Sequence, residues 1–172
     1  MSKPEAKRAS QHDAVKVRLA VNEDAAAISV VLLSSFGQNR ENYTPAAFVI
    51  VTPPEEEIAG RFLEGPQWVA DLDGKVIGTV GVTHEPEGLY IRSLGVAPEA
   101  QGQGVASRML DAIDEYASTV DTKRIFLYTT YFVPAAVKLY EKHGYKWVRD
   151  TTADEWYGTP GLEMDKILRR DN

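Results

Sequence analysis

Apolar and polar positions follow strand-like alternation or helix-like spacing along most of the chain after its first 14 residues. Residues 15–21 alternate and are rich in valine, which predicts a strand. Asn22 is a predicted N-cap, and the apolar residues after it recur at helical spacing. Residues 52–62 predict a second helix, because Thr52 and Glu55 fit a capping box and a proline stands at the first helical position.

The middle of the chain predicts three strands and a long helix. Residues 67–82 are two apolar runs around Asp73 and Gly74, a dipeptide typical of a two-residue hairpin turn. Residues 89–97 are the third predicted strand. An apolar stripe at helical spacing then predicts a helix over about residues 104–120.

The last third of the chain alternates strands with one short helix. Residues 124–130 predict a buried strand, and Pro134 opens a helix that Gly144 closes. Residues 145–151 and 161–168 predict two final strands around a polar loop. The predicted order is therefore β-α-α-β-β-β-α-β-α-β-β. This order indicates an α/β fold, with a central mixed β-sheet of about seven strands and helices on both faces.

The composition indicates one globular domain. The chain has 172 residues, of which 44% are hydrophobic and 26% charged, and these fractions are typical of a folded protein. We expect a single domain over residues 15–172 after a polar tail at residues 1–14. The tail has no apolar segment typical of a signal peptide, and no run of about 18 apolar residues predicts a membrane span. A cytoplasmic protein with no membrane partner is expected.

The net charge and the missing residue types argue against several other classes. A net charge of −6 argues against a nucleic-acid partner, which favours a basic surface. The chain has no cysteine, so a thiolate metal site and a cysteine nucleophile are excluded. His12, His84 and His143 show no metal-ligand spacing, and we expect no metal. The chain has no G-x-S-x-G elbow, so a serine hydrolase is not predicted.

The stretch PEAQGQGVASRML, residues 98–110, combines two glycines with the start of a predicted helix. Such a turn is either purely structural or exposes backbone N–H groups that a phosphate can approach. The P-loop pattern is absent, because no lysine followed by serine or threonine closes the turn. A dinucleotide-binding turn needs a third glycine where Ser107 stands, and it needs an acid after the next strand, which ends in threonines.

The hexapeptide that begins at Gln101 matches a further pattern, Q/R-x-x-G-x-G/A. With the strand before it, the helix after it and the later PAAVKLYEKHGY, the chain resembles the GNAT superfamily of acetyl-CoA-dependent N-acetyltransferases over residues 15–168. The resemblance implies that acetyl-CoA is the co-substrate. It also implies direct transfer of acetyl to a primary amine of a small molecule or peptide, and a possible homodimer. A CoA-binding module with lost or regulatory chemistry is the alternative.

The resemblance assigns the CoA-binding residues. The pyrophosphate would be bound by the backbone N–H groups of Gln101, Gly102, Gln103, Gly104, Val105 and Ala106, and Ser107 could add its hydroxyl. The backbone groups of Leu94 and Val96 would pair with the pantetheine amides as a strand does. The family has a bulge in this strand, which we place at Gly95; close packing against a helix is the other explanation of that glycine.

Tyr140 stands at the position of the family's frequent general acid, which protonates the leaving thiolate. A plain core tyrosine is the alternative. Val133 departs from the asparagine that many members have at this position. Tyr90 replaces the family's carboxylate base. His84, Glu85 and Glu87 lie nearby in the sequence and could act directly or through a water relay, so we assign no base.

The acceptor site is expected between the first two helices and the last predicted loop. Residues 36–43 and 153–161 supply aromatic and acidic side chains, a combination that suits a cation, although ordinary surface loops explain them equally well. These side chains are Phe36, Tyr43, Trp156, Tyr157, Glu41, Asp154 and Glu155.

Overall fold

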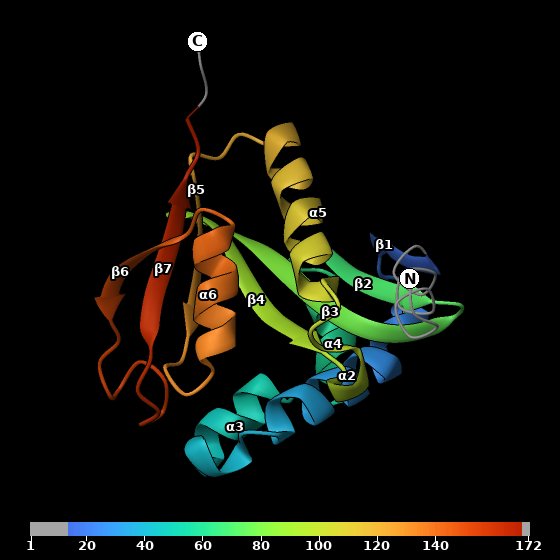
Figure 1. Cartoon of the computed structure of the whole chain (residues 1–172), viewed down its shortest axis with the longest axis horizontal. Coiled ribbons are helices and arrows are strands. Elements are labelled where there is room, and N and C mark those ends of the chain that lie inside the picture. Colours follow the sequence, from blue (N-terminus) through green and yellow to red (C-terminus); the bar gives the residue numbers. More distant parts are fainter. Residues whose placement is uncertain (1–13, 170–172) are drawn as a thin grey trace, which may run out of the picture.

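The computed structural model describes residues 14–169, which form one seven-stranded sheet with helices against it (Figure 1). The strands are β1 (Val15–Leu19), β2 (Gln67–Leu72), β3 (Lys75–Glu85), β4 (Gly88–Val96), β5 (Arg124–Thr129), β6 (Lys146–Asp150) and β7 (Leu162–Ile167). The helices are α2 (Ala25–Gly37), α3 (Pro45–Val51), α4 (Glu55–Arg61), α5 (Val105–Thr119) and α6 (Pro134–Lys142). The strand order is β1-β2-β3-β4-β5-β7-β6.

The sheet is mixed, as predicted. Every neighbouring pair is antiparallel except β4 and β5, which are parallel and pair only through Leu89 with Ile125 and Tyr90 with Phe126. The predicted hairpin turn between β2 and β3 is confirmed. Asp73 and Gly74 both have positive φ, 51° and 87°, as a two-residue turn of type I′ requires.

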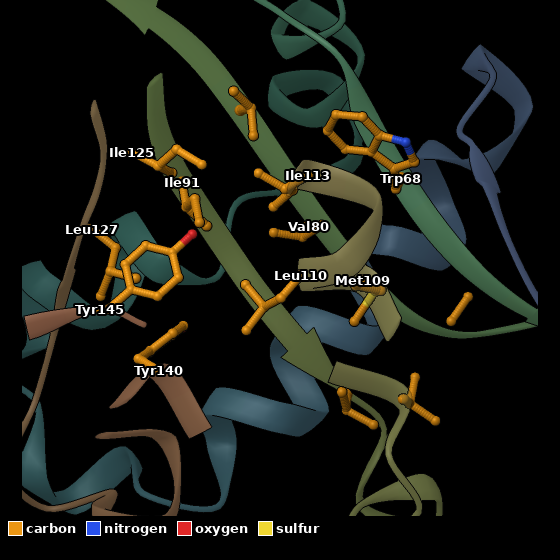
Figure 2. Packing of buried hydrophobic residues seen from close by; sticks show 14 of the residues in the cluster. Trp68, Val80, Ile91, Met109, Leu110, Ile113, Ile125, Leu127, Tyr140 and Tyr145 are labelled. Carbon is orange, nitrogen blue, oxygen red and sulfur yellow. The ribbon is translucent and has the colours of Figure 1, made fainter. Parts of the chain in front are cut away.

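Helices cover both faces of the sheet, which confirms that part of the prediction. Met109 and Ile113 of α5 pack with Val80 of β3 in the larger core cluster, which Figure 2 shows from close by. Leu32 of α2 and Ile58 of α4 belong to a second cluster, which includes Val69 of β2. Val80 pairs with the residue that stands next to Val69 in β2. Paired residues share a face of a sheet and adjacent residues point to opposite faces, so the two clusters lie on opposite sides of the sheet.

The helices between β1 and β2 differ from the prediction. The predicted helix at residues 52–62 begins only at Glu55, because the Thr52 hydroxyl donates to the Phe48 carbonyl oxygen at 2.6 Å instead of capping a helix. An additional helix, α3, precedes it, and its N-cap Thr44 accepts a hydrogen bond from the N–H of Ala47 at 3.2 Å. The predicted capping box is therefore wrong.

The start of α2 also differs from the prediction. Asn22 opens a 3-10 turn, η1 (Asn22–Asp24), and the α-helix begins at Ala25. The Asp24 carboxylate accepts from the N–H of Val21 and pairs with Arg18, each at 2.8 Å. Hydrogen bonding from Arg18 lowers the pKa of Asp24, so this carboxylate remains charged where β1 meets α2.

A bulge interrupts the pairing of β3 with β4. Gly95 pairs with Thr79, and Arg92 pairs with Gly81, so Ser93 and Leu94 lie opposite Val80 alone. The bulge is thus at Ser93 and Leu94, and the prediction that placed it at Gly95 is wrong. A Cβ on Gly95 would approach Leu32 Cδ2 to 3.0 Å, so close packing against α2 explains that glycine.

Two further expectations concern the ends of the chain and membranes. The predicted tail, residues 1–14, lies outside the described residues except for Ala14, and the single domain over residues 15–172 stays a prediction. Between residues 14 and 169, no helix combines the length and the apolar character that crossing a bilayer requires.

Candidate active site

A cavity of about 490 Å³ opens where β4 and β5 separate. The two strands pair at two positions only, and Figure 1 shows them diverging beyond that point. Side chains from α2, α3, α4, β4, β5 and α6 line the cavity, together with the loops before α5 and β7. Ser93 and Leu94 both line the cavity, so the bulge forms part of its wall. A bulge bends the strand that contains it, which fits the separation of β4 from β5.

One end of the cavity is the glycine-rich loop before α5. Gly102 and Gly104 have φ of 72° and 80°, a left-handed conformation that favours glycine, and Gly104 is the N-cap of α5. A Cβ built on Gly102 has no neighbouring atom within 4 Å, so space is open above the loop. The N–H groups of the first helical turn have no partner within the helix, so this end offers donors to an anion.

A glutamine on either side of Gly102 fixes the loop. Gln101 Nε2 donates to the carbonyl oxygen of Val96 and to Gln38 Oε1, both at 3.0 Å, which ties the loop to β4 and α2. Gln103 Nε2 donates to the Glu99 carbonyl oxygen at 3.1 Å. The loop therefore holds its shape through its own side chains.

The structure brings nearly all the sequence-predicted cofactor residues to this one cavity. Gln103 is the exception, since it does not line the cavity and its side chain is exposed. The predicted cofactor residues that line it are Leu94, Val96, Gln101, Gly102, Gly104, Val105, Ala106 and Ser107. Tyr140, the predicted general acid, lines it as well.

The backbone of Val96 faces the open side of β4. The N–H of Ala97 donates to Ile77 of β3 at 2.8 Å, and successive N–H groups of a strand point in opposite directions. The N–H of Val96 accordingly points away from β3 and donates to Ser35 Oγ at 3.4 Å. Ser35 lines the cavity, so its hydroxyl lies where a pantetheine amide is expected to pair.

Ser107 has a partner that sequence reasoning missed. Its Oγ lies 2.7 Å from Nε2 of His143, which follows α6, and Nδ1 of His143 lies 3.7 Å from an Asp111 oxygen. Potential metal-ligating atoms of His143, Asp111 and Asp114 lie within 4.8 Å of one another. Lys166 Nζ bonds both oxygens of Asp114, at 2.7 and 2.8 Å. Residue spacing could not reveal this cluster, because His143 comes from another element than the two aspartates.

Tyr140 is at once a core residue and part of the cavity wall. It belongs to the larger core cluster, and its ring meets that of Tyr145 edge-on with centroids 5.9 Å apart (Figure 2). Burial raises the pKa of Tyr140 well above its usual value, and the neighbouring Tyr90 and Tyr43 raise it further. This phenol stays protonated at ordinary pH and can donate a hydrogen bond into the cavity.

The structure does not bring the candidate bases to the cavity. His84, Glu85 and Glu87 border a separate hollow at the other end of β3 and β4. His84 Nε2 lies 2.7 Å from the Tyr116 hydroxyl, and Glu85 accepts from Thr83 at 3.0 Å. Among the described residues that line the main cavity, none is aspartate, glutamate or histidine.

The end of the cavity at which the sequence placed the acceptor is aromatic as expected, but the carboxylates that the sequence offered there do not line it. Phe36, Tyr43 and Trp156 line the cavity, and Tyr128 lies 5.5 Å from Trp156 between ring centroids. Burial raises the pKa of Tyr43 to about 12. The predicted partners Tyr157, Glu41, Asp154 and Glu155 do not line it.

Two arginines take the place of the predicted carboxylates. The carboxylate of Glu155 instead pairs with Arg149 at 2.6 Å. Arg61 and Arg92 are the charged residues of the described cavity wall, and sequence reasoning missed both. Of the two explanations that the sequence left open, ordinary surface loops therefore account for these carboxylates, and they do not form a site for a cation in the cavity. Loop carboxylates remain in water or pair at the surface because an unpaired buried charge is costly.

Comparisons with known proteins agree with this geometry. The family model described as "Acetyltransferase (GNAT) family" matches residues 34–145. "Probable N-acetyltransferase camello" of Xenopus laevis is 33% identical over 82 residues, which are 46% of this chain and 37% of that protein. "N-acetylaspartate synthetase" of Danio rerio is 31% identical over 104 residues, 59% of this chain and 36% of that protein. The chain thus matches under two fifths of the length of these relatives.

Solved structures share the fold. The PaiA N-acetyltransferase of Thermoplasma acidophilum, solved in complex with coenzyme A, superposes with a TM-score of 0.75 at 16% identity. The alignment covers 90% of this chain and 99% of that one. The GNAT fold predicted from the sequence is confirmed.

Proposed function

Since this chain belongs to the GNAT acetyltransferase family, we propose that it transfers the acetyl group of acetyl-CoA to a primary amine by direct attack. The observation that carries the proposal is a single cavity that extends from the glycine-rich loop to Tyr140 and the aromatic end. A donor with a pyrophosphate at one end and a thioester at the other fits this arrangement.

The donor would be bound by backbone groups. The pyrophosphate would accept from N–H groups of residues 101–106 at the positive end of α5, and Ser107 would add its hydroxyl. The pantetheine arm would extend beside β4, with its amides opposite Leu94 and Val96. This edge of β4 is open because β5 no longer pairs with it there. The N–H of Val96 now donates to Ser35 Oγ, and the carbonyl oxygen of a pantetheine amide would accept this hydrogen bond instead.

The reaction needs the amine nitrogen to be uncharged. Its lone pair attacks the thioester carbon, and the carbon–sulfur bond then breaks, leaving an amide and the CoA thiolate. An alkylammonium gives up two protons over these steps. One proton ends on the thiolate and the other in solvent. Since the described wall has no carboxylate or histidine, we infer that water accepts the first proton. Arg61 and Arg92 favour the neutral amine, because like charges disfavour an ammonium.

Tyr140 would act on the leaving group as a hydrogen-bond donor. A thiol such as that of cysteine has a pKa of about 8.5. The pKa of Tyr140 is raised above that of an ordinary tyrosine, so the phenol is a weaker acid than the thiol it faces. Full proton transfer is uphill, and stabilisation of the thiolate by the phenol O–H is the favoured contribution.

The replacement Tyr140→Phe tests this role. We expect kcat to fall about 10-fold to 100-fold, since a hydrogen bond to a charged group contributes about 1.5–3 kcal/mol, with an unchanged KM for acetyl-CoA. Tyr145→Phe is the matched control: its hydroxyl is buried without a partner among the described residues, and it does not line the cavity. Unchanged turnover in Tyr140→Phe would leave Tyr140 with a packing role only.

The pH profile gives a second measure of the same step. We expect kcat/KM to rise with pH as the amine loses its proton. No fall is expected below about pH 10, the usual tyrosine pKa, because burial raises the pKa of Tyr140 above that value. A falling limb between pH 7 and 9 would assign the donor role to another group.

A CoA-binding module without chemistry is the second candidate. The absence of a carboxylate or histidine from the described cavity wall favours it, as does Val133 at the cavity wall before α6. Thermal stabilisation by acetyl-CoA, without thiol release in the presence of any amine, would support this candidate. A cytoplasmic location, a homodimer, and the absence of metal, nucleic-acid and membrane partners stay predictions.

A further inference from the structure

The two arginines of the cavity wall lie beside the strand bulge. Arg92 of β4 immediately precedes the bulge residue Ser93, and Arg61 ends α4. Arg61 Nη1 donates to Ser93 Oγ at 2.9 Å, which places its guanidinium at the bulge. Ser93 has a φ of 57°, a conformation rare outside glycine, and this is typical of a functional site. Both arginines therefore line the cavity next to the bulge, one from β4 and one from α4.

These guanidiniums are buried more deeply than the carboxylates that pair with them. The side chains of Arg61 and Arg92 are 7% and 23% exposed, whereas Glu57 and Glu64 are each 51% exposed. Arg61 Nη2 meets Glu57 Oε1 at 2.9 Å, and Arg92 Nη1 meets Glu64 Oε2 at 2.6 Å. A guanidinium has five N–H groups, more than these contacts use. Neither carboxylate lines the cavity, so the wall itself presents positive charge.

This arrangement has an energetic cost within the protein alone. Burial lowers the pKa of Arg61, and the positive charge of Arg92 lowers it further, so the folded chain holds the two cations against a penalty. Buried charges are stabilised when they are paired and fully hydrogen-bonded. Each guanidinium already pairs with one half-exposed glutamate outside the cavity, and an anionic group in the cavity would add a partner on the side that faces the cavity.

The arginines are also distant from the place expected for the CoA phosphates. Arg92 precedes Val96 by four residues, which span at most about 13 Å because the bulge shortens the strand, and the glycine-rich loop lies beyond Val96. The proposed pantetheine arm fills the space between, so the guanidiniums lie at the thioester end. The anion that they meet therefore belongs to the acceptor.

We propose that the acceptor is a free amino acid whose carboxylate is bound by Arg61 and Arg92. The inference rests on the proposed function and narrows its acceptor to amines that bear a carboxylate. Guanidinium N–H groups match a carboxylate with two parallel bonds, and the amino group then lies one carbon away, near the bulge. Tyr43, Tyr128 and Trp156 border the same end of the cavity and can contact an apolar side chain. Polyamines and aminoglycosides are disfavoured by like charge.

A matched set of three amines tests the inference. L-phenylalanine, L-phenylalaninamide and phenethylamine share a ring and an amine, but the first alone has a carboxylate. With acetyl-CoA and thiol release as the readout, we expect kcat/KM for phenylalanine to exceed that for the other two by at least about tenfold. The amide has the less basic amine, so amine reactivity works against the expected preference. Aspartate and spermidine complete the panel as a dicarboxylic and a cationic amine.

Replacement of Arg92 tests whether this arginine causes the preference for an amine that bears a carboxylate. We expect Arg92→Gln to lower kcat/KM for phenylalanine about 30-fold. The value for the amide should fall by a much smaller factor, since the amide loses only the effect of the positive charge on its amine. Arg92→Lys should recover part of the loss, since it keeps the charge but not the paired N–H groups. Lys16 is an exposed residue of the edge strand β1, so Lys16→Gln removes one positive charge elsewhere and controls for net charge. Affinity for CoA, measured by calorimetry, checks that each variant is folded.

The outcomes separate this inference from the proposed function. Equal or better turnover of the amide or of spermidine overturns the inference and leaves acetyl transfer intact. A preference for the acid that persists in Arg92→Gln overturns it as well, as does a loss of acetyl-CoA affinity in that variant. If no amine is acetylated, the proposed function fails. Titration of phenylalanine and its amide into the CoA-saturated protein then decides whether the arginines bind a carboxylate.

Discussion

The two ends of the cavity are built in different ways. The donor end, where CoA is proposed to bind, comes from one continuous stretch, the end of β4 and the loop that leads to Gly104, and it offers mainly backbone groups. The acceptor end, where the amine is proposed to bind, is assembled from α2, α3, α4, β4, β5 and the loop before β7, and it offers side chains. A backbone site of this kind is specified by local conformation, whereas a side-chain site depends on how distant elements pack.

This difference implies that the two ends tolerate change differently. At the donor end, glycines at φ of 72° and 80° leave little freedom in residue type. At the acceptor end, any residue that an adjacent helix or loop presents can alter selectivity while the donor remains bound. Donor binding and acceptor choice should then respond to separate substitutions.

The largest effect is expected at Gly104. Replacement by aspartate places a carboxylate and a side chain where the phosphates approach, so affinity for CoA should fall at least about 100-fold. Gly74→Asp is the matched control, because Gly74 also has a left-handed φ, 87° against 80°, and lies outside the cavity. Both variants should lose about 1–2 kcal/mol of stability from backbone strain. Calorimetry with CoA and thermal melting measure the two effects, and CoA affinity within about threefold of the unmodified protein in Gly104→Asp would refute the phosphate site.

A smaller effect is expected at Trp156, and it should change the binding of the amine rather than that of CoA. Trp156→Ala removes an aromatic wall of the acceptor end, so KM for the amine should rise about tenfold while KM for acetyl-CoA stays unchanged. The neighbouring Tyr157, 55% exposed and outside the cavity, provides the control variant Tyr157→Ala. Steady-state kinetics with each substrate varied in turn separates the two constants. An equal rise of both KM values in Trp156→Ala would show that the ends are not independent.

The same difference explains which features the sequence could predict. The glycine turn, the helix after it and the hairpin at Asp73 and Gly74 are local, because each depends on the conformational preference of a few adjacent residues. The order of the remaining strands followed from apolar periodicity. The helix α3 was missed although Thr44 and Pro45 form the same kind of start signal that was given to residues 52 and 53.

Features that depend on register or packing could not be predicted in this way. The resemblance predicted a bulge in β4, but its position at Ser93 and Leu94 is set by the pairing of β3 with β4, which leaves no local mark in the sequence. Glu57 and Arg61 have the spacing of an exposed helical ion pair, yet the packing of α4 near the bulge buries the arginine. The two arginines at this end of the cavity were therefore not predicted, and of the two explanations offered for the loop carboxylates the ordinary surface loops hold.

The smallest effect is expected at His143, which connects the donor end to α6. His143→Ala frees the Ser107 hydroxyl, now held 2.7 Å from Nε2, so its orientation toward a phosphate is lost. Affinity for CoA should fall about threefold, within the net contribution of about 0.5–1.5 kcal/mol of one hydrogen bond. Ser107→Ala should lose as much or slightly more, and the double variant no more than Ser107→Ala alone, because the imidazole acts through the hydroxyl. Additive losses measured by calorimetry would instead indicate that His143 reaches the phosphates directly, and the donor end would then depend on a distant element as the acceptor end does.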